Sequence, residues 1–207
     1  QLPLYLLMVA VSFVLGFALT YMFGYEDEVE EVSGAISEAE TDRLTEEAVT
    51  GTVVSPSEGV IQTPIVGDVV ALSNVNDPVF SSGAMGQGIA VKPSQDVVYA
   101  PADAEVTIVF PTGHAYGLRT ANGAEILIHV GIDTVSMNGE GFNHKVAQGD
   151  KVKAGDVLGT FDSAKIAAAG LDNTTMVIVT NTADFASVNP VASGSVAKGD
   201  AIIEVKA

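Results

Sequence analysis

A run of 22 residues without a charged side chain, residues 2–23, stands near the start of the chain and is its strongest structural constraint. As an α-helix rising about 1.5 Å per residue, this run would be about 33 Å long, and the hydrocarbon of a bilayer is about 30 Å thick. A secretory signal is the alternative, but it has basic residues ahead of a shorter apolar core and a small-residue cleavage site after it, and neither is present. We therefore expect one transmembrane helix in residues 1–24.

Acidic side chains dominate the segment that follows. Residues 1–58 contain eleven acidic residues and one basic residue, a net charge of −10, and residues 59–207 carry −7. Because so acidic a stretch repels itself and has few aromatic residues, we expect residues 25–58 to form a flexible linker. Neither part has the basic patch that nucleic acid requires, which excludes nucleic-acid binding. The sequence has no cysteine, which excludes disulfides, thiolate catalysis and zinc–thiolate sites.

From Gly59 onward, short apolar runs alternate with turns rich in Gly, Pro, Asp and Asn. Runs of this length and spacing are typical of β-strands, so we expect a mostly β domain over residues 59–207. One short helix is expected in residues 162–171, which Gly170 would end. The sequence Ala-Asn-Gly at residues 121–123 predicts a tight hairpin, because Asn and Gly tolerate positive φ.

Two histidines flank that hairpin. Pairing its arms about Asn122 and Gly123 would set His129 opposite a position close to Tyr116, with His114 two residues further along the same face. Side chains at that separation can share a ligand about the size of a phosphoryl group. His129 also lies inside a run of apolar β-formers, which would hold its ring in place while the ring stays accessible from outside.

Several kinds of site use histidine, and the sequence favours one of them. The simplest alternative makes His129 a core histidine bonded to the backbone and His114 a loop residue. A zinc hydrolase needs a third ligand; Asp133 is the candidate, whereas His144 belongs to a different loop, and no His-x-His or His-Glu-x-x-His spacing is present. No serine occupies a nucleophile elbow, and Lys165 lies in the expected helix rather than on the hairpin tip that a lipoyl-type carrier needs. The remaining interpretation is a transient phosphoryl acceptor, because imidazole is a competent nucleophile near neutral pH.

Five stretches carry a resemblance to one family: residues 86–93 (GQGIAVKP), 100–118 (APADAEVTIVFPTGHAYGL), 125–142 (EILIHVGIDTVSMNGEGF), 146–162 (VAQGDKVKAGDVLGTFD) and 193–200 (SGSVAKGD). Over residues 59–207 the chain resembles the glucose-type IIA domain of the bacterial sugar phosphotransferase system. The resemblance implies an antiparallel β-sandwich with a duplicated hybrid motif. It also implies a phosphotransferase with a phosphohistidine intermediate, which accepts phosphate from the histidine-containing phosphocarrier protein and passes it to a cysteine on a IIB domain.

The resemblance also implies roles for individual residues. His129 takes the place of the phosphorylated histidine. His114 takes that of a second histidine, which hydrogen-bonds the phosphoryl oxygens, with Thr112 behind it as its relay partner. Asp133 matches an acidic neighbour of the site. Six residues fall where the family has an apolar ring for docking both partners: Val79, Phe80, Met85, Phe110, Leu127 and Val135.

The order of the segments is similar to one branch of this system, which serves sucrose, trehalose and β-glucosides. There a single chain contains IIB, IIC and IIA in that order, so residues 1–24 resemble the last helix of a IIC permease that is truncated in this sequence. This implies IIB and IIC partner domains, a place in the bacterial inner membrane, a IIA domain tethered in the cytoplasm, and no required cofactor. A second hypothesis is a regulatory binding module that uses the same apolar face, with a zinc ion that bridges His114 and His129 to a partner.

Overall fold

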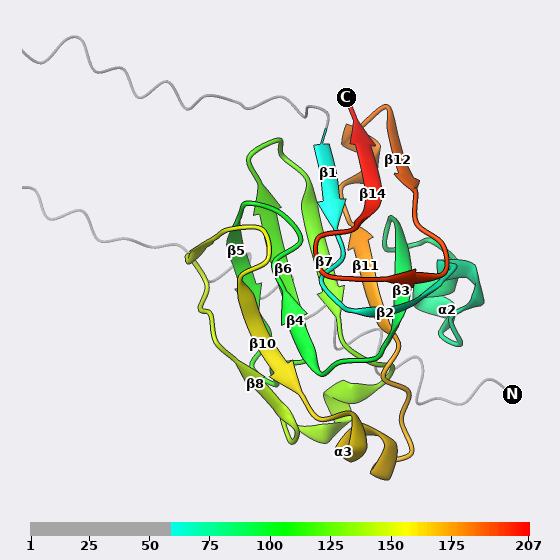
Figure 1. Ribbon diagram of the computed structural model, residues 1–207, viewed down its shortest axis with the longest axis vertical. Coiled ribbons are helices and arrows are strands. Elements are labelled where there is room, and N and C mark those ends of the chain that lie inside the picture. Colours follow the sequence, from blue (N-terminus) through cyan, green and yellow to red (C-terminus); the bar gives the residue numbers. More distant parts are fainter. Residues whose placement is uncertain (1–58) are drawn as a thin grey trace, which may run out of the picture. The chain divides into compact units, whose positions relative to one another are not determined.

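Antiparallel β-strands are the main regular structure of residues 59–207, the part of the chain that the computed structural model describes (Figure 1). The larger sheet has eight strands in the order β13-β2-β3-β11-β7-β6-β5-β9. In chain order they are β2 (Gly67–Val70), β3 (Gln87–Pro93), β5 (Ala104–Val109), β6 (Ala115–Thr120), β7 (Glu125–His129), β9 (Lys151–Val152), β11 (Thr175–Val179) and β13 (Ser195–Val196). The mostly β fold expected from the sequence is confirmed.

Two smaller sheets of three strands each complete the β structure of this region, in the orders β1-β14-β12 and β4-β10-β8. Their strands are β1 (Gly59–Gln62), β4 (Val97–Tyr99), β8 (Phe142–His144), β10 (Val157–Phe161), β12 (Ser187–Pro190) and β14 (Ala201–Lys206). The described helices are short: α2 (Pro78–Ser81), α3 (Ser163–Ala168) and the 3₁₀ turns η1 (Leu72–Asn74), η2 (Thr134–Met137) and η3 (Thr182–Asp184).

One kind of turn, x-x-Gly-Asp, leads into three of these strands. In each case the backbone N–H of the first residue donates to the aspartate carboxylate three residues later at 2.8 Å: Ala147 to Asp150, Lys153 to Asp156 and Ala197 to Asp200. The turns immediately precede β9, β10 and β14. Local hydrogen bonding of the aspartate to its own turn thus sets where each strand begins.

The central strands separate two apolar clusters. The main core includes Ile126 and Ile128 of β7 and Val177 of β11. A smaller cluster on the other side includes Met176 of β11 and, at its edge, Leu127 of β7. Side chains alternate between the two faces of a strand. Both faces of β11 are covered, so every one of its residues is buried, whereas β7 alternates between buried and half-buried positions. This alternation places His129 on the outer face, with the smaller cluster.

The β6–β7 hairpin has a different register from the one expected. Its loop holds three residues, 121–123, with Gly123 at φ +86°, and it is therefore longer by one residue than a two-residue Asn-Gly turn. As a result, His129 lies opposite Ala115 and not opposite Tyr116, so the predicted register is wrong by one residue. A shift of one residue reverses the face of every side chain that it affects.

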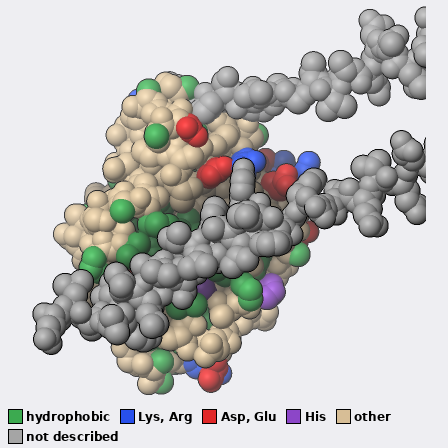
Figure 2. Space-filling model, turned by 180° about the vertical axis from the view of Figure 1, so that it is seen from behind, with side chains coloured by type: hydrophobic (Ala, Val, Ile, Leu, Met, Phe, Trp, Pro, Cys, Tyr) green, Lys and Arg blue, Asp and Glu red, His purple; other side chains and the backbone are tan. Residues whose placement is uncertain are grey.

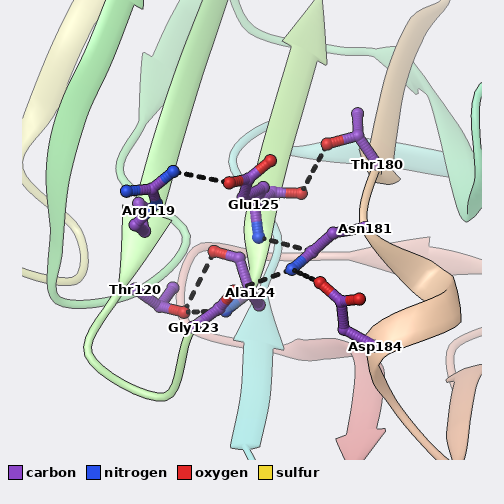
Figure 3. A network of polar contacts seen from close by, with 8 residues as sticks. All are labelled: Arg119, Thr120, Gly123, Ala124, Glu125, Thr180, Asn181 and Asp184. Atoms are coloured by element: carbon purple, nitrogen blue, oxygen red, sulfur yellow. Dashed lines mark hydrogen bonds and ion pairs between the residues drawn. The ribbon is translucent and has the colours of Figure 1, made fainter. Parts of the chain in front are cut away.

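A polar network fastens the loop end of this hairpin to the end of β11 (Figure 3). The side chain of Asn181 accepts a hydrogen bond from the Glu125 N–H at 2.9 Å and donates to the Gly123 carbonyl at 2.9 Å and to Asp184 at 3.0 Å. Across the hairpin, Arg119 forms an ion pair with Glu125 at 2.6 Å. The network fastens the loop end of β7 to the end of β11, and β7 pairs with β11 as far as His129, which lies opposite Met176.

The two short α-helices begin at aspartate caps. Asp162 accepts from the Lys165 N–H at 3.0 Å at the start of α3, and Gly170 follows the helix with φ +76°, which confirms the expected helix and its end. α2 was not expected, although the pair Asp77-Pro78 is a sequence signal for a capped helix start. Asp77 accepts from the Val79 N–H at 2.7 Å. In Figure 1, α2 lies beside β3.

Both amino-terminal predictions, the transmembrane helix of residues 1–24 and the linker of residues 25–58, lie outside the described residues. Within residues 59–207, no helix has the length and apolar character needed to cross a membrane.

Candidate functional site

His129 ends β7 with its ring held by the backbone of the loop that follows. Its Nδ1 lies 2.9 Å from the carbonyl oxygen of Gly131. A carbonyl only accepts, so the neutral ring carries its proton on Nδ1 and leaves the lone pair on Nε2. Gly131 reaches this position with φ +78°, and a Cβ on it would lie 2.4 Å from Thr134 Cγ2, so the residue must be glycine.

His114 lies directly before β6 with its ring beside that of His129. The ring centroids are 4.8 Å apart, and the ring planes make an angle of 78°. Nδ1 of His114 lies 2.5 Å from the hydroxyl of Thr112. The prediction that the two histidines are neighbours is confirmed, although the register behind it was wrong. Because His114 precedes the regular strand, strand alternation does not decide its direction.

Burial keeps both rings neutral. It is the largest influence on His114, which is 3% exposed, and together with the nearby His129 it lowers the pKa of His114 from 6.5 to about 4. Burial also lowers the pKa of His129, against the opposing effects of its bond to Gly131 and of two carboxylates, Asp77 and Asp133. At neutral pH the pair therefore offers uncharged nitrogen atoms.

Two carboxylates act on His129 through their charge. Asp133, expected beside the site, is exposed in the loop after His129 and has a left-handed backbone with φ +57°. Asp77, the cap of α2, is half-buried, and the sequence interpretation did not include it. The Asp-Pro cap signal could have located the helix start, but it could not show that α2 packs against His129.

The six residues expected to form an apolar ring differ in exposure. Val79 and Val135 are each 55% exposed and Met85 is 38% exposed, whereas Phe110 and Leu127 are half-buried. Figure 2 shows hydrophobic side chains gathered in the middle of one face of the domain, with histidine beside them.

Phe80, the sixth of these residues, is only 7% exposed and packs on His129, with ring centroids 5.1 Å apart. Phe110 packs on His114 in the same way at 5.5 Å. Each histidine therefore has a phenylalanine partner that contributes to its burial.

The alternative sites are not assembled in this region. In residues 59–207, no group of three or more His, Cys, Asp or Glu side chains is arranged to hold a metal ion. His144 lies on β8, exposed and paired in register with Gly159 of β10. Lys165 lies on α3, where it forms an ion pair with Glu140 at 3.3 Å.

Fold and site together define a class of protein: an antiparallel β-domain that can carry a group on an imidazole nitrogen. A model of the family "phosphoenolpyruvate-dependent sugar phosphotransferase system, EIIA 1" matches residues 59–185. The chain belongs to this family, whose glucose-type domains are phosphoryl carriers in sugar uptake and phosphotransferases with a phosphohistidine intermediate.

The relatives are components of sugar permeases. A β-glucoside-specific EIIBCA component of Dickeya chrysanthemi is 50% identical over 134 residues, which cover 65% of this chain and 21% of that protein. A sucrose-specific EIIBCA component of Pediococcus pentosaceus is 40% identical over all 207 residues, 30% of its own length. The chain thus spans between a fifth and a third of these relatives.

Other relatives are shorter, and this chain covers most of their length. A glucose-specific EIIA component of Oceanobacillus iheyensis is 43% identical over 145 residues, which cover 70% of this chain and 88% of that protein. The solved structure of a glucose permease IIA from Mycoplasma capricolum has a TM-score of 0.68 and 34% identity, and the match covers 72% of this chain and 96% of that one. The expected IIA fold is confirmed by this likeness.

Proposed function

We propose that the chain carries a phosphoryl group on Nε2 of His129, accepted from the histidine-containing phosphocarrier protein and passed to a cysteine of a IIB domain. The observation that carries this proposal is the bond between His129 Nδ1 and the Gly131 carbonyl, which leaves Nε2 unprotonated beside a second neutral histidine. An uncharged Nε2 with a free lone pair is a ready nucleophile.

The transfer needs no proton movement at the acceptor. The Nε2 lone pair of His129 attacks phosphorus, and the bond from phosphorus to the donor's histidine breaks as the new phosphorus–nitrogen bond forms. The imidazole that accepts the group becomes cationic, and its Nδ1–H stays on the Gly131 carbonyl, whose partial negative charge stabilises that cation. Reversal of the same steps hands the group to the next acceptor.

His114 is suited to hold the phosphoryl oxygens. If the Thr112 hydroxyl donates to Nδ1, the proton of the neutral ring is on Nε2, and this N–H can donate to an oxygen of the group on His129. The low pKa of His114 keeps it from binding a second proton. Thr112 therefore sets the tautomer of His114 as Gly131 sets that of His129.

The charges around the site indicate what the partner brings. Among the described residues, the charged groups that act on His129 are the carboxylates of Asp77 and Asp133, and no cationic side chain contributes. A phosphoryl group there has repulsive neighbours, which favours passing it on. We propose that during transfer a partner supplies the missing positive charge and covers the exposed members of the apolar ring, Val79, Met85 and Val135.

The setting of the domain is proposed from its relatives and from the residues before it. The match to the sucrose-specific EIIBCA component includes residues 1–58, which supports a permease with IIB, IIC and IIA in one chain. On this proposal residues 2–23 anchor the chain in the bacterial inner membrane as the end of a IIC domain, with the IIA domain in the cytoplasm. No cofactor takes part in the transfer. A zinc ion would find two ligands in His114 and His129 and would need the others from a partner.

The test is a phosphate-labelling experiment. The chain is mixed with phosphoenolpyruvate, enzyme I and the phosphocarrier protein, and acid-labile phosphate is mapped by mass spectrometry in wild type, His129→Gln and His114→Gln. We expect label on His129 in wild type, none in His129→Gln, and label that is not passed on in His114→Gln. An unlabelled wild type, or label elsewhere than on His129, would overturn the proposal.

A further inference from the structure

The loop after β7 presents the carbonyl that sets the tautomer of His129, and hydrogen bonds hold two peptide groups of this loop in place. The peptide between Gly131 and Ile132 donates its N–H to the Asp172 carbonyl at 2.8 Å, while its own carbonyl accepts from His129. The backbone of Asp172 is held in turn, because its carboxylate accepts from the N–H and the hydroxyl of Thr174, each at 2.7 Å.

The preceding peptide, between Val130 and Gly131, is held by a hydrogen bond from a side chain. The hydroxyl of Thr134 donates to the Val130 carbonyl at 2.5 Å, and both residues are fully buried. The N–H of Val130 donates to the carbonyl of His114 at 2.8 Å. Val130 therefore links the backbones of the two histidines, and Thr134 holds Val130 from the other side.

Thr134 also lies close to Gly131. Its Cγ2 would lie 2.4 Å from a Cβ at position 131, so the methyl group packs near the glycine backbone. The hydroxyl, through its bond to the Val130 carbonyl, holds the peptide that leads into Gly131 and so helps to aim the Gly131 carbonyl at Nδ1.

We infer that Thr134 is a positioning residue for phosphoryl transfer, which acts by aiming the Gly131 carbonyl so that His129 keeps its lone pair on Nε2. The expected effect of Thr134 on the transfer rate rests on the proposed function, whereas its expected effect on the tautomer of His129 does not. Without the hydroxyl, the buried Val130 carbonyl has lost its donor and the peptide can turn to find another. The Gly131 carbonyl then leaves Nδ1, and the proton can move to Nε2, where it blocks attack.

The experiment compares the whole chain as wild type, Thr134→Val, Thr134→Ser and Thr63→Val. Valine replaces the hydroxyl with a methyl, and serine keeps the hydroxyl. Thr63→Val is the matched control, because Thr63 is 2% exposed and donates to the Ile65 carbonyl at 2.5 Å outside the loop. The sequence has three histidines, so ¹⁵N-histidine labelling gives three ring systems from which the tautomer of His129 is read directly. The rate of transfer from the phosphorylated phosphocarrier protein is measured on the same samples.

We expect His129 to be protonated on Nδ1 in wild type, Thr134→Ser and Thr63→Val, and to carry a substantial Nε2–H population in Thr134→Val. The transfer rate should fall about tenfold in Thr134→Val, as expected for one lost hydrogen bond, and little in the other two variants. If Thr134→Val loses stability as Thr63→Val does but keeps the wild-type tautomer and rate, Thr134 is only structural and the inference is overturned.

If the Thr134→Val variant does not fold, a second comparison is used. Thr134→Ser then decides, because loss of the Nδ1–H tautomer in a variant that keeps the hydroxyl would contradict the role given to that hydroxyl. A wild type that shows the Nδ1–H tautomer but accepts no phosphate would overturn the proposed function, and the tautomer comparison among the variants would still test Thr134.

Discussion

When His114 is replaced by glutamine, the free energy of unfolding should fall less at acid pH than it does in wild type. In the folded chain, burial and the neighbouring His129 lower the pKa of His114 from 6.5 to about 4. In the unfolded chain the ring titrates near its ordinary value of about 6.5, so the unfolded state binds the proton first as the pH falls. The corresponding stability is therefore complete above pH 6.5 and is lost as the pH falls from about 6.5 to about 4. At about 1.4 kcal/mol per pH unit, the contribution is about 3 kcal/mol.

The measurement is urea unfolding of wild type and His114→Gln at pH 7 and pH 4.5. Carboxylates titrate in the same range, but they do so in both proteins, and comparison of the two losses cancels them. Glutamine is neutral at both pH values and can still hydrogen-bond the Thr112 hydroxyl. Wild type should lose about 2.5 kcal/mol more than the variant between the two pH values.

The matched control is His144→Gln, which removes an exposed histidine outside the pair. Equal losses in wild type and His114→Gln would refute the reasoning. They would show that the His114 ring is not held neutral by burial, and the role proposed for it as a neutral donor to the phosphoryl oxygens would fail as well.

Three further changes test the surroundings of His129. Phe80→Ala uncovers the ring, so the pKa of His129, which burial lowers, should rise toward 6.5 in a histidine NMR titration; an unchanged value would contradict the packing argument. Asp77→Asn keeps the helix cap but removes a charge that raises this pKa, so the same titration should show a lower value, and a higher one would refute the argument. Gly131→Ala should cost about 2 kcal/mol or more in thermal unfolding and reduce labelling of His129, because its Cβ would lie 2.4 Å from Thr134 Cγ2; a stable, fully labelled variant would show that the loop has room.

Much of the fold follows from local patterns in the sequence. The turn at residues 121–123 predicted a hairpin, and pairing of its arms led us to expect the two histidines as neighbours. The helix α3 was expected from its apolar pattern and from Gly170. These features depend on interactions between residues close in the chain, which is why a sequence pattern can reveal them.

The sequence by itself therefore determined a mostly β domain with two histidines on one hairpin, and the tertiary structure decided what those histidines can do. The extra loop residue changed the register. The pKa of His129 depends on α2, far from the hairpin in the chain: Phe80 packs on the ring and adds to the burial that lowers this pKa, whereas Asp77 raises it. The lone pair on Nε2 depends on where the Gly131 carbonyl points, and Asp172 helps to set that direction from another part of the chain. Burial, charge and hydrogen-bond direction depend on distances in space, which local sequence patterns do not contain.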